Sequence, residues 1–212
     1  MTLTAYTRVR TDIALESLWA RIENAFPSEE NRGYFDEIRA RKNEESVRES
    51  LCTLLVLAEL LKNAQIDTST LVLARNENGK PYFKSSQIEI SLSHSHGYAA
   101  VAISDRSRIG IDIETADMPR EKAEKLAERF FSESEKQELH DSPNDFLSIW
   151  TRKEAFAKMQ GINLADLVAY EKKNGTGERK TTFVHEFKAD GYPMTVCLEN
   201  PDEITYIGEI TI

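Results

Sequence analysis

The stretch from Ile109 to Glu114 constrains the fold most, because isoleucine alternates strictly with other residue types along it. Gly110, Asp112 and Glu114 stand between the isoleucines. Successive side chains of a strand point to opposite faces, so this pattern predicts a strand with one buried isoleucine face and two carboxylates on the other. The two carboxylates start roughly 7 Å apart along the backbone, close enough to share one hard cation. Glycine adds no bulk beside them.

A second segment supplies a further acid and a cation. The proline after Ser142 favours a first helical position, which predicts a helix from about residue 143 to residue 158 that Gly161 ends. Glu154 and Lys158 stand four residues apart on that helix and therefore share a face. A few carboxylates beside a lysine suit a magnesium-bound phosphate, because the lysine balances charge on the phosphate that leaves.

Each segment also has an ordinary structural interpretation. A lone Asp-x-Glu on a strand is usually a solvated face, and a Glu and a Lys four apart on a helix usually form a surface pair worth a few tenths of a kcal/mol. The complete pattern favours a functional interpretation. It resembles the signature of the 4′-phosphopantetheinyl transferases, which is (Ile/Val)-Gly-(Ile/Val)-Asp-(Ile/Val)-Glu followed by (Trp/Phe)-(Ser/Thr/Cys)-x-Lys-Glu-(Ala/Ser)-x-x-Lys. Residues 109–114 and 150–158 complete both motifs.

The resemblance extends to three further blocks in the order and spacing of that family. These blocks are Asn78-Gly-Lys-Pro81, Ser91-Leu-Ser-His-Ser95 and Phe130-Phe-Ser-Glu-Ser-Glu135. The resemblance therefore spans about residues 42 to 168, and ordered blocks are more specific than one short motif. With 212 residues the chain is also similar in length to the monomeric, surfactin-synthetase-activating type of the family, so a monomer is expected.

The resemblance implies a reaction. Members transfer the phosphopantetheine arm of coenzyme A to a serine of an apo acyl- or peptidyl-carrier protein and release adenosine 3′,5′-bisphosphate. It implies that Asp112, Glu114 and Glu154 hold Mg²⁺ against the diphosphate of coenzyme A. Glu154 is then the expected general base, and Lys158 is expected to stabilise the departing phosphate.

The resemblance also assigns residues to coenzyme A. In the family the Gly-Lys-Pro segment lines the adenine pocket, and here it is Gly79, Lys80 and Pro81. A Ser-His pair at a strand end contacts phosphate in the family, and here the pair is Ser93 and His94.

Cations for the coenzyme's 3′-phosphate are the least complete part of the resemblance. Arg48 resembles the arginine that the family uses there, and Lys153 is expected among the coenzyme-binding residues. Some members carry two further phosphate-binding lysines upstream, whereas this chain has the acidic stretch 29–37. Either Lys42 or Arg41 compensates, or the 3′-phosphate is held more weakly.

Composition excludes several classes of protein. The net charge of -9 argues against a general binder of nucleic acid or of anionic membranes. No apolar run reaches the length of a membrane span and residues 1–10 are too polar for a signal peptide, so a cytoplasmic location is expected. Cys52 and Cys197 lack partners at zinc-ligand spacing and are expected to be buried thiols.

The order of elements predicts an α+β protein. Asn43 is expected to cap a helix with an apolar stripe from Val47 to Leu61, and Ser132 is expected to start another helix with a capping box. A charged amphipathic helix is expected at 121–131, and strands are expected at 71–75, 88–93, 98–103 and 109–114, followed by short strands across 167–212 around a polar turn at 174–177. The resemblance implies two pseudo-symmetric subdomains, each a long helix on a small antiparallel sheet, at residues 1–105 and 106–212. It places the active site in the cleft between them.

The acidic carrier protein needs local cations for docking, because the net charge of this chain does not attract it. The segment after Glu114 offers Arg120, Lys122, Lys125 and Arg129 beside Met118, and we expect it to dock the carrier helix.

Two other functions stay open from the sequence alone. One is a coenzyme A or nucleotide-binding protein of the same fold without carrier-modifying activity, although such a binder has no need of Lys158. The other is a hydrolase with Asp112 and Glu154 as its two carboxylates, which leaves the Gly-Lys-Pro and Ser-His segments unexplained.

Overall fold

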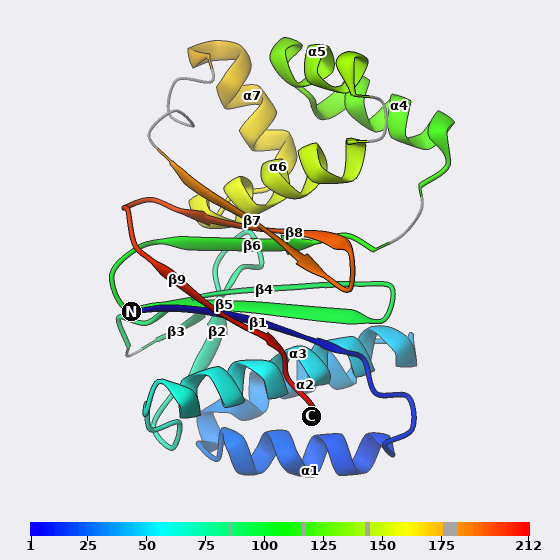
Figure 1. Cartoon of the computed structure of the whole chain (residues 1–212). Helices are drawn as coiled ribbons and strands as arrows, with labels where there is room; N and C mark the ends of the chain where they lie inside the picture. Colours follow the sequence, from blue (N-terminus) through cyan, green and yellow to red (C-terminus); the bar gives the residue numbers. More distant parts are fainter. Residues whose placement is uncertain (85, 116–117, 143–144, 176–181) are drawn as a thin grey trace.

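The chain folds into four layers, two sheets between two layers of helices (Figure 1). The computed structural model describes residues 1–84, 86–115, 118–142, 145–175 and 182–212. One outer layer contains α1 (Leu15–Ala25), α2 (Arg32–Arg39) and α3 (Glu44–Asn63), with a short 3₁₀ turn at Glu29–Asn31. The other contains α4 (Arg120–Phe130), α5 (Glu133–Asp141), α6 (Phe146–Gln160) and α7 (Leu164–Asn174). The protein is thus α+β, as the sequence predicts.

The sheet beside α1–α3 has the strand order β4-β5-β1-β9. Its strands are β1 (Thr2–Arg8), β4 (Glu89–Ser95), β5 (Tyr98–Ser104) and β9 (Ile204–Glu209). β5 pairs antiparallel with β4 and β1, whereas β9 lies parallel to β1. The last strand therefore returns to the sheet of the N-terminal half, and a division at residues 105 and 106 does not separate the two sheets.

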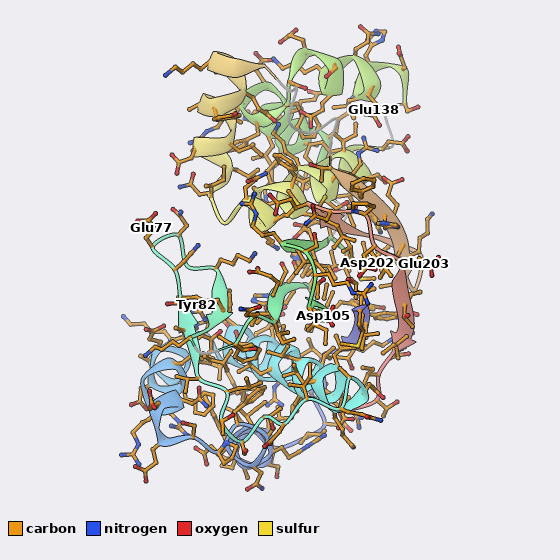
Figure 2. All side chains as sticks on the ribbon, turned by 90° about the vertical axis from the view of Figure 1, so that its left-hand side faces the viewer. Glu77, Tyr82, Asp105, Glu138, Asp202 and Glu203 are labelled. Carbon is orange, nitrogen blue, oxygen red and sulfur yellow. The ribbon has the colours of Figure 1, made fainter. Side chains whose placement is uncertain are left out.

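The second sheet has the order β6-β8-β7 and is antiparallel throughout. It contains β6 (Ile109–Ile113), β7 (Phe183–Ala189) and β8 (Tyr192–Leu198). A separate hairpin, β2 (Leu73–Arg75) with β3 (Pro81–Phe83), extends from the first sheet. Figure 2 shows Glu77 at the tip of this hairpin, on the opposite side of the molecule from Asp202 and Glu203.

Apolar side chains fill each space between layers. α1–α3 bury their apolar faces on the first sheet, and a second cluster lies between the sheets, where Ile109, Ile111 and Ile113 meet Ala100 and Ala102. The alternation of isoleucine predicted this buried face. α6 and α7 cover the outer face of the second sheet around Cys197, and α4 and α5 pack on α6 through an aromatic cluster.

Local signals place several elements where the sequence predicts them. The side chain of Asn43 accepts a hydrogen bond from the backbone N–H of Ser46, which caps α3. Ser132 and Glu135 form the reciprocal capping box of α5. Cys52 and Cys197 are both buried, as the sequence predicts.

Two expectations about elements were wrong. The segment expected to begin a run of short strands at about residue 167 is instead the helix α7, because Asn163 caps it through the N–H of Asp166 and Leu167 packs under it. The helix that carries Glu154 and Lys158 was expected from about residue 143, but α6 begins at Phe146 after Asp145. Pro143 lies outside the described residues, as does the end of the polar turn expected at 174–177.

Among the helices that the structure describes, none is long and apolar enough to cross a membrane.

Candidate active site

A close contact between β6 and α6 builds the site. A Cβ atom at Gly110 would lie 1.9 Å from the backbone oxygen of Ala155 and 2.4 Å from the backbone nitrogen of Met159. Only glycine therefore lets the backbone of α6 rest directly on the strand. The glycine of the motif does more than leave room beside the carboxylates, since it sets the distance between the acidic strand and the helix that carries Glu154 and Lys158.

Asp112 is held from both sides of this contact. Its side chain is buried, and its Oδ1 accepts hydrogen bonds from Lys158 Nζ at 2.7 Å and from Ser93 Oγ at 2.8 Å. Lys158 Nζ also donates to Ser93 Oγ at 2.9 Å. Burial opposes the charged form of Lys158, but the carboxylates of Asp112 and Glu154 outweigh it and raise the pKa of the ammonium. Ser93 of β4, Asp112 of β6 and Lys158 of α6 thus form one hydrogen-bonded triad.

Two more carboxylates face the same region. Glu114 Oε2 accepts a hydrogen bond from Ser95 Oγ at 2.8 Å, and burial together with the charge of Asp112 raises the pKa of Glu114. Burial also raises the pKa of Glu154 to about 7, an effect that Lys158 opposes and that Asp112 and Glu114 reinforce. Glu114 and Glu154 are thus both close enough to Asp112 for its negative charge to raise their pKa.

The acids suit a hard divalent cation. Asp112 Oδ2 is buried and lacks a hydrogen-bond partner within the described part of the chain, and such an atom is costly unless a cation or donor reaches it. Carboxylate oxygens are the donors that Mg²⁺ prefers. No group of three His, Cys, Asp or Glu side chains among the described residues already has the arrangement of a metal site. Asp112 instead pairs with Lys158 at 2.7 Å. The kinds of group present fit a cation whose remaining ligands come from a bound phosphate.

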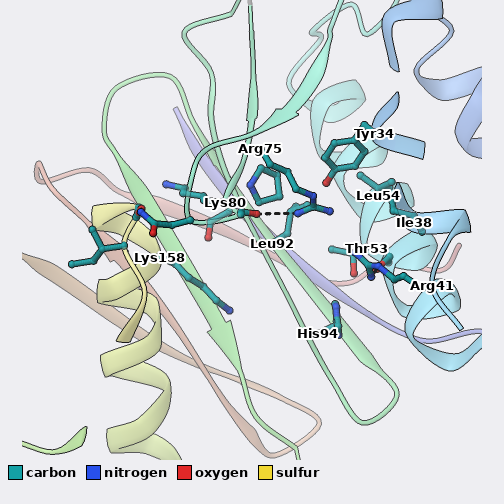
Figure 3. A pocket seen from close by; sticks show the side chains of 17 residues that line it. Tyr34, Ile38, Arg41, Thr53, Leu54, Arg75, Lys80, Leu92, His94 and Lys158 are labelled. Atoms are coloured by element: carbon teal, nitrogen blue, oxygen red, sulfur yellow. Dashed lines mark hydrogen bonds between the residues drawn. The ribbon is translucent and has the colours of Figure 1, made fainter. Parts of the chain in front are cut away.

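A pocket of about 250 Å³ opens beside this triad, and Lys158 lines it (Figure 3). Its wall combines residues of α2, α3, the β2–β3 hairpin, β4 and the end of α6. The polar and charged residues of the wall are Tyr34, Arg41, Ser50, Thr53, Arg75, Asn78, Lys80, Ser91, His94 and Lys158. The pocket is thus rich in cations although the whole chain is acidic.

Two arginines of the wall were not assigned by the sequence. Arg41 donates to Ser50 Oγ at 2.7 Å, and Arg75 lies over the ring of Tyr34, with its guanidinium carbon 4.6 Å from the ring centroid. Figure 3 shows Arg75 between Lys80 on one side of the pocket and Arg41 on the other. Arg41 was one candidate to replace the two upstream lysines that some family members have. Nothing in the sequence pointed to Arg75, which the β2–β3 hairpin brings to the pocket.

The Gly-Lys-Pro segment lines this pocket, and its lysine faces a backbone carbonyl. Lys80 Nζ donates to the oxygen of Ile109 at 3.0 Å, and burial lowers its pKa. Asn76 and Asn78 both donate their side-chain amides to the oxygen of Gly161, at 3.1 and 3.0 Å. The hairpin is therefore tied to the end of α6, which encloses one side of the pocket.

His94 lines the pocket, whereas Ser93 faces the carboxylates. His94 Nδ1 lies 3.1 Å from Glu49 Oε2, and burial lowers the histidine's pKa although Glu49 opposes that shift. The hydroxyl of Ser93, which was expected to contact phosphate, is engaged by Asp112 and Lys158. The two neighbours thus face different parts of the site because their side chains alternate along β4.

Arg48 differs from its expected role. Its guanidinium donates to the backbone oxygens of Arg10 and Ile13, at 3.0 and 2.6 Å, and pairs with Glu44 at 3.0 Å. It does not line the pocket. Arg48 therefore holds the segment that follows β1 against α3.

Lys153 also differs from its expected role as a coenzyme ligand. Its side chain is 0% exposed, and Nζ lies 3.0 Å from Glu135 of α5 and 2.9 Å from Glu171 of α7. One residue along a helix turns the side chain by about 100°, so Lys153 and its neighbour Glu154 leave α6 in different directions. Lys153 joins α5 and α7 to α6 instead of reaching the pocket.

A second groove lies between α4, α5 and the start of α6, and we call it the α4–α5 groove. Apolar and charged residues share its wall: Met118, Arg120, Ala123, Glu124, Ala127, Glu128, Lys136, Leu139, His140, Phe146 and Leu147. Met118 and Arg120 of the segment that the sequence analysis linked to docking line this groove, whereas Lys122, Lys125 and Arg129 of α4 are not among its lining residues.

Comparison with known protein families agrees with this geometry over the second half of the chain. Residues 108–199 match the family model of the 4′-phosphopantetheinyl transferase superfamily. The matched stretch contains β6, α6 and both acidic motifs, but not the pocket residues of α2, α3 and β4. No curated protein matches the chain. The family match supports a transferase that moves phosphopantetheine to carrier proteins.

Proposed function

We propose that the protein transfers the 4′-phosphopantetheine arm of coenzyme A to a serine of an apo acyl- or peptidyl-carrier protein in a Mg²⁺-dependent reaction. One observation supports this most directly: Lys158 both lines the cationic pocket and contacts Asp112, so the phosphate side and the acidic side share a residue. A diphosphate that extends from the pocket to the carboxylates would pass beside Lys158.

The pocket would hold the adenosine 3′-phosphate end of coenzyme A. Arg41 and Arg75 are the side chains that we assign to the 3′-phosphate, because guanidinium groups bind phosphate through paired donors. His94 lies on the route from these arginines to Lys158 and would contact the diphosphate. Gly79 and Pro81 would line the adenine, and Lys80 would keep their loop in place through Ile109.

The acidic side would carry out the transfer. When bound, Mg²⁺ would be held by Asp112, Glu114 and Glu154 and would withdraw charge from the diphosphate. Glu154 is the proposed base that takes the proton of the carrier serine. The serine oxygen forms a bond to the phosphorus that bears pantetheine, and the bond from that phosphorus to the bridging oxygen breaks. Lys158 would neutralise the bridging oxygen as adenosine 3′,5′-bisphosphate leaves.

In this proposal residues 1–105 form the coenzyme side and residues 106–212 the metal side, except that β9 belongs to the first sheet. The α4–α5 groove would receive a carrier helix. Lys125 already pairs with Glu121 on the surface at 2.7 Å, but exposed pairs of this kind are weak and leave the lysine accessible to an acidic partner. Changing Lys122 and Lys125 to Glu should raise KM for the carrier and leave KM for coenzyme A unchanged. An equal effect on both constants would remove this assignment.

The test of the function is a gain in mass. The protein is incubated with coenzyme A, Mg²⁺ and a panel of apo carrier proteins, and each carrier is examined for added phosphopantetheine. Asp112→Ala and Lys158→Met should give no product, whereas Gly33→Ala, which has nothing within 4 Å of the added methyl group, should act like the unsubstituted chain. Absence of product with every carrier would refute transfer. Coenzyme A binding in that case would indicate a binding protein of the same fold.

A further inference from the structure

Strands β4 and β6 lie at the edges of their respective sheets, and a row of serines joins them. Ser91, Ser93 and Ser95 alternate along β4 and are all buried. The first of them accepts a hydrogen bond from the backbone N–H of Ile111 at 2.9 Å. Serine hydroxyls thus take the place that a neighbouring strand would occupy beside this edge of β6.

The last serine of the row is fixed by several contacts. Ser95 Oγ donates to Glu114 Oε2 at 2.8 Å and accepts from the backbone N–H of Thr115 at 3.4 Å. The hydroxyl of Thr115 donates in turn to the backbone oxygen of Ser95 at 2.9 Å. Ser95 Oγ also lies 3.2 Å from His96 Nδ1. The serine is therefore held from the strand end that carries Glu114 as well as from its own strand.

Glu114 needs such a contact more than Asp112 does. It follows the last residue of β6, and a glutamate side chain has more rotatable bonds to order than an aspartate. Ser95 binds only Oε2, so its hydrogen bond orients the carboxylate and leaves Oε1 for another partner. Ser93 does the same for Asp112, where Oδ1 is bound and Oδ2 is the buried atom that lacks a partner among the described residues. The two acids are thus oriented by one strand of the other sheet.

We propose that Ser95 is a positioning residue that orients Glu114 for a divalent cation, so that β4 of the first sheet sets the geometry of a cation site carried by the second. This inference rests on the metal site of the proposed function. Hydrogen-bond partners of metal ligands typically change metal affinity about 10- to 100-fold when they are removed. A serine that merely filled space between the sheets would not affect metal affinity.

The test measures binding of Mn²⁺ alone, a cation with similar ligand preference, by the electron paramagnetic resonance signal of the free ion. Ser95→Ala should weaken Mn²⁺ binding about 10-fold. Ser91→Ala is the matched control, because Ser91 is in the same buried row but, among the described residues, its hydroxyl bonds a backbone N–H of β6 and neither acid. It should lower Tm and keep Mn²⁺ affinity within about twofold. Ser95→Cys keeps the size of the side chain with a weak donor and gives the same test if the alanine variant does not fold.

Unchanged Mn²⁺ affinity in both Ser95 variants would overturn the inference alone. An equal loss in Ser91→Ala would overturn it too, because the effect would then belong to the packing of the two strands. If the unsubstituted protein binds no Mn²⁺, the metal site of the proposed function fails together with this inference. Carrier modification in the mass assay would then have to be explained by a different site.

Discussion

Gly110→Ala tests whether the contact between β6 and α6 sets the active geometry. The added Cβ would lie 1.9 Å from the backbone oxygen of Ala155, whereas ordinary contact begins at 3.4 Å. The helix or the strand must therefore retreat by about 1.5 Å. The nearest atoms are backbone atoms of Ala155 and Met159, on successive turns of α6. No side-chain rotation can therefore relieve the clash.

Both stability and activity should fall. Overpacking of a close-packed interior costs about 1–3 kcal/mol, and we expect the upper end of that range because rigid backbone must move. A loss of about 3 kcal/mol lowers Tm by roughly 6–12 °C in a chain of this size. A displacement of about 1 Å between Asp112 and the residues of α6 can cost about 100-fold in rate, so kcat/KM should fall by that order.

The assays are urea unfolding, thermal unfolding and the mass-based transfer reaction. Gly33→Ala is the matched control. Gly33 is an exposed residue of α2, and a methyl group added there has nothing within 4 Å. This substitution should stabilise the helix by about 0.5–1 kcal/mol. If Gly110→Ala retains the unfolding free energy and the kcat/KM of the unsubstituted chain, α6 does not depend on this contact and the reasoning is refuted.

Three further perturbations test other parts of the structure. Lys153→Met removes the buried cation that pairs with Glu135 and Glu171 and should cost about 3–5 kcal/mol in urea unfolding, whereas Lys125→Met on the surface should cost under about 1 kcal/mol; similar losses would contradict the buried ion pairs. Arg75→Met should raise KM for coenzyme A roughly 10- to 100-fold and leave that for dephospho-coenzyme A unchanged; parallel changes would place the 3′-phosphate elsewhere. The hydrogen bond from Arg8, opposed by burial, lowers the pKa of Asp190 in the folded state, so its stabilisation is present above about pH 5 and is lost as the pH falls below the unfolded carboxyl's pKa of about 4. The difference in unfolding free energy between the unsubstituted chain and Asp190→Asn should therefore shrink over that interval, and a constant difference would exclude the charge as its cause.

Local sequence signals predicted elements well where the controlling interactions are themselves local. The cap at Asn43 and the capping box at Ser132 each depend on contacts within three residues, and both were confirmed. α7 was missed although Asn163 caps it locally. Most of the apolar surface on which α7 packs belongs to α6, which lies outside the segment itself.

The candidate site shows the same limit. Arg41 lies in the loop just before α3 and Arg48 on the first turns of α3, so they are near each other in the chain. The packing of residues 10–13 on α3 takes Arg48 away from the pocket. Arg75 reaches the pocket through a hairpin, a contact that no spacing along the chain reveals. The serines of β4 did leave a signal, since Ser-x-Ser-x-Ser on a strand puts three hydroxyls on one face, but its partner strand was not identifiable.

The sequence by itself determined the buried isoleucine face of β6, the helix caps and the kinds of group that the chemistry requires, because each depends on the repeat of a strand or helix and on short-range hydrogen bonds. The tertiary structure alone decided which cation serves which anion. Lys153 and Lys158 lie on one helix, yet the first is buried between α5 and α7 while the second reaches Asp112 and the pocket. The direction of a charged side chain depends on which oppositely charged groups the packing of distant segments brings within about 3 Å, and burial without such a partner is too costly to persist.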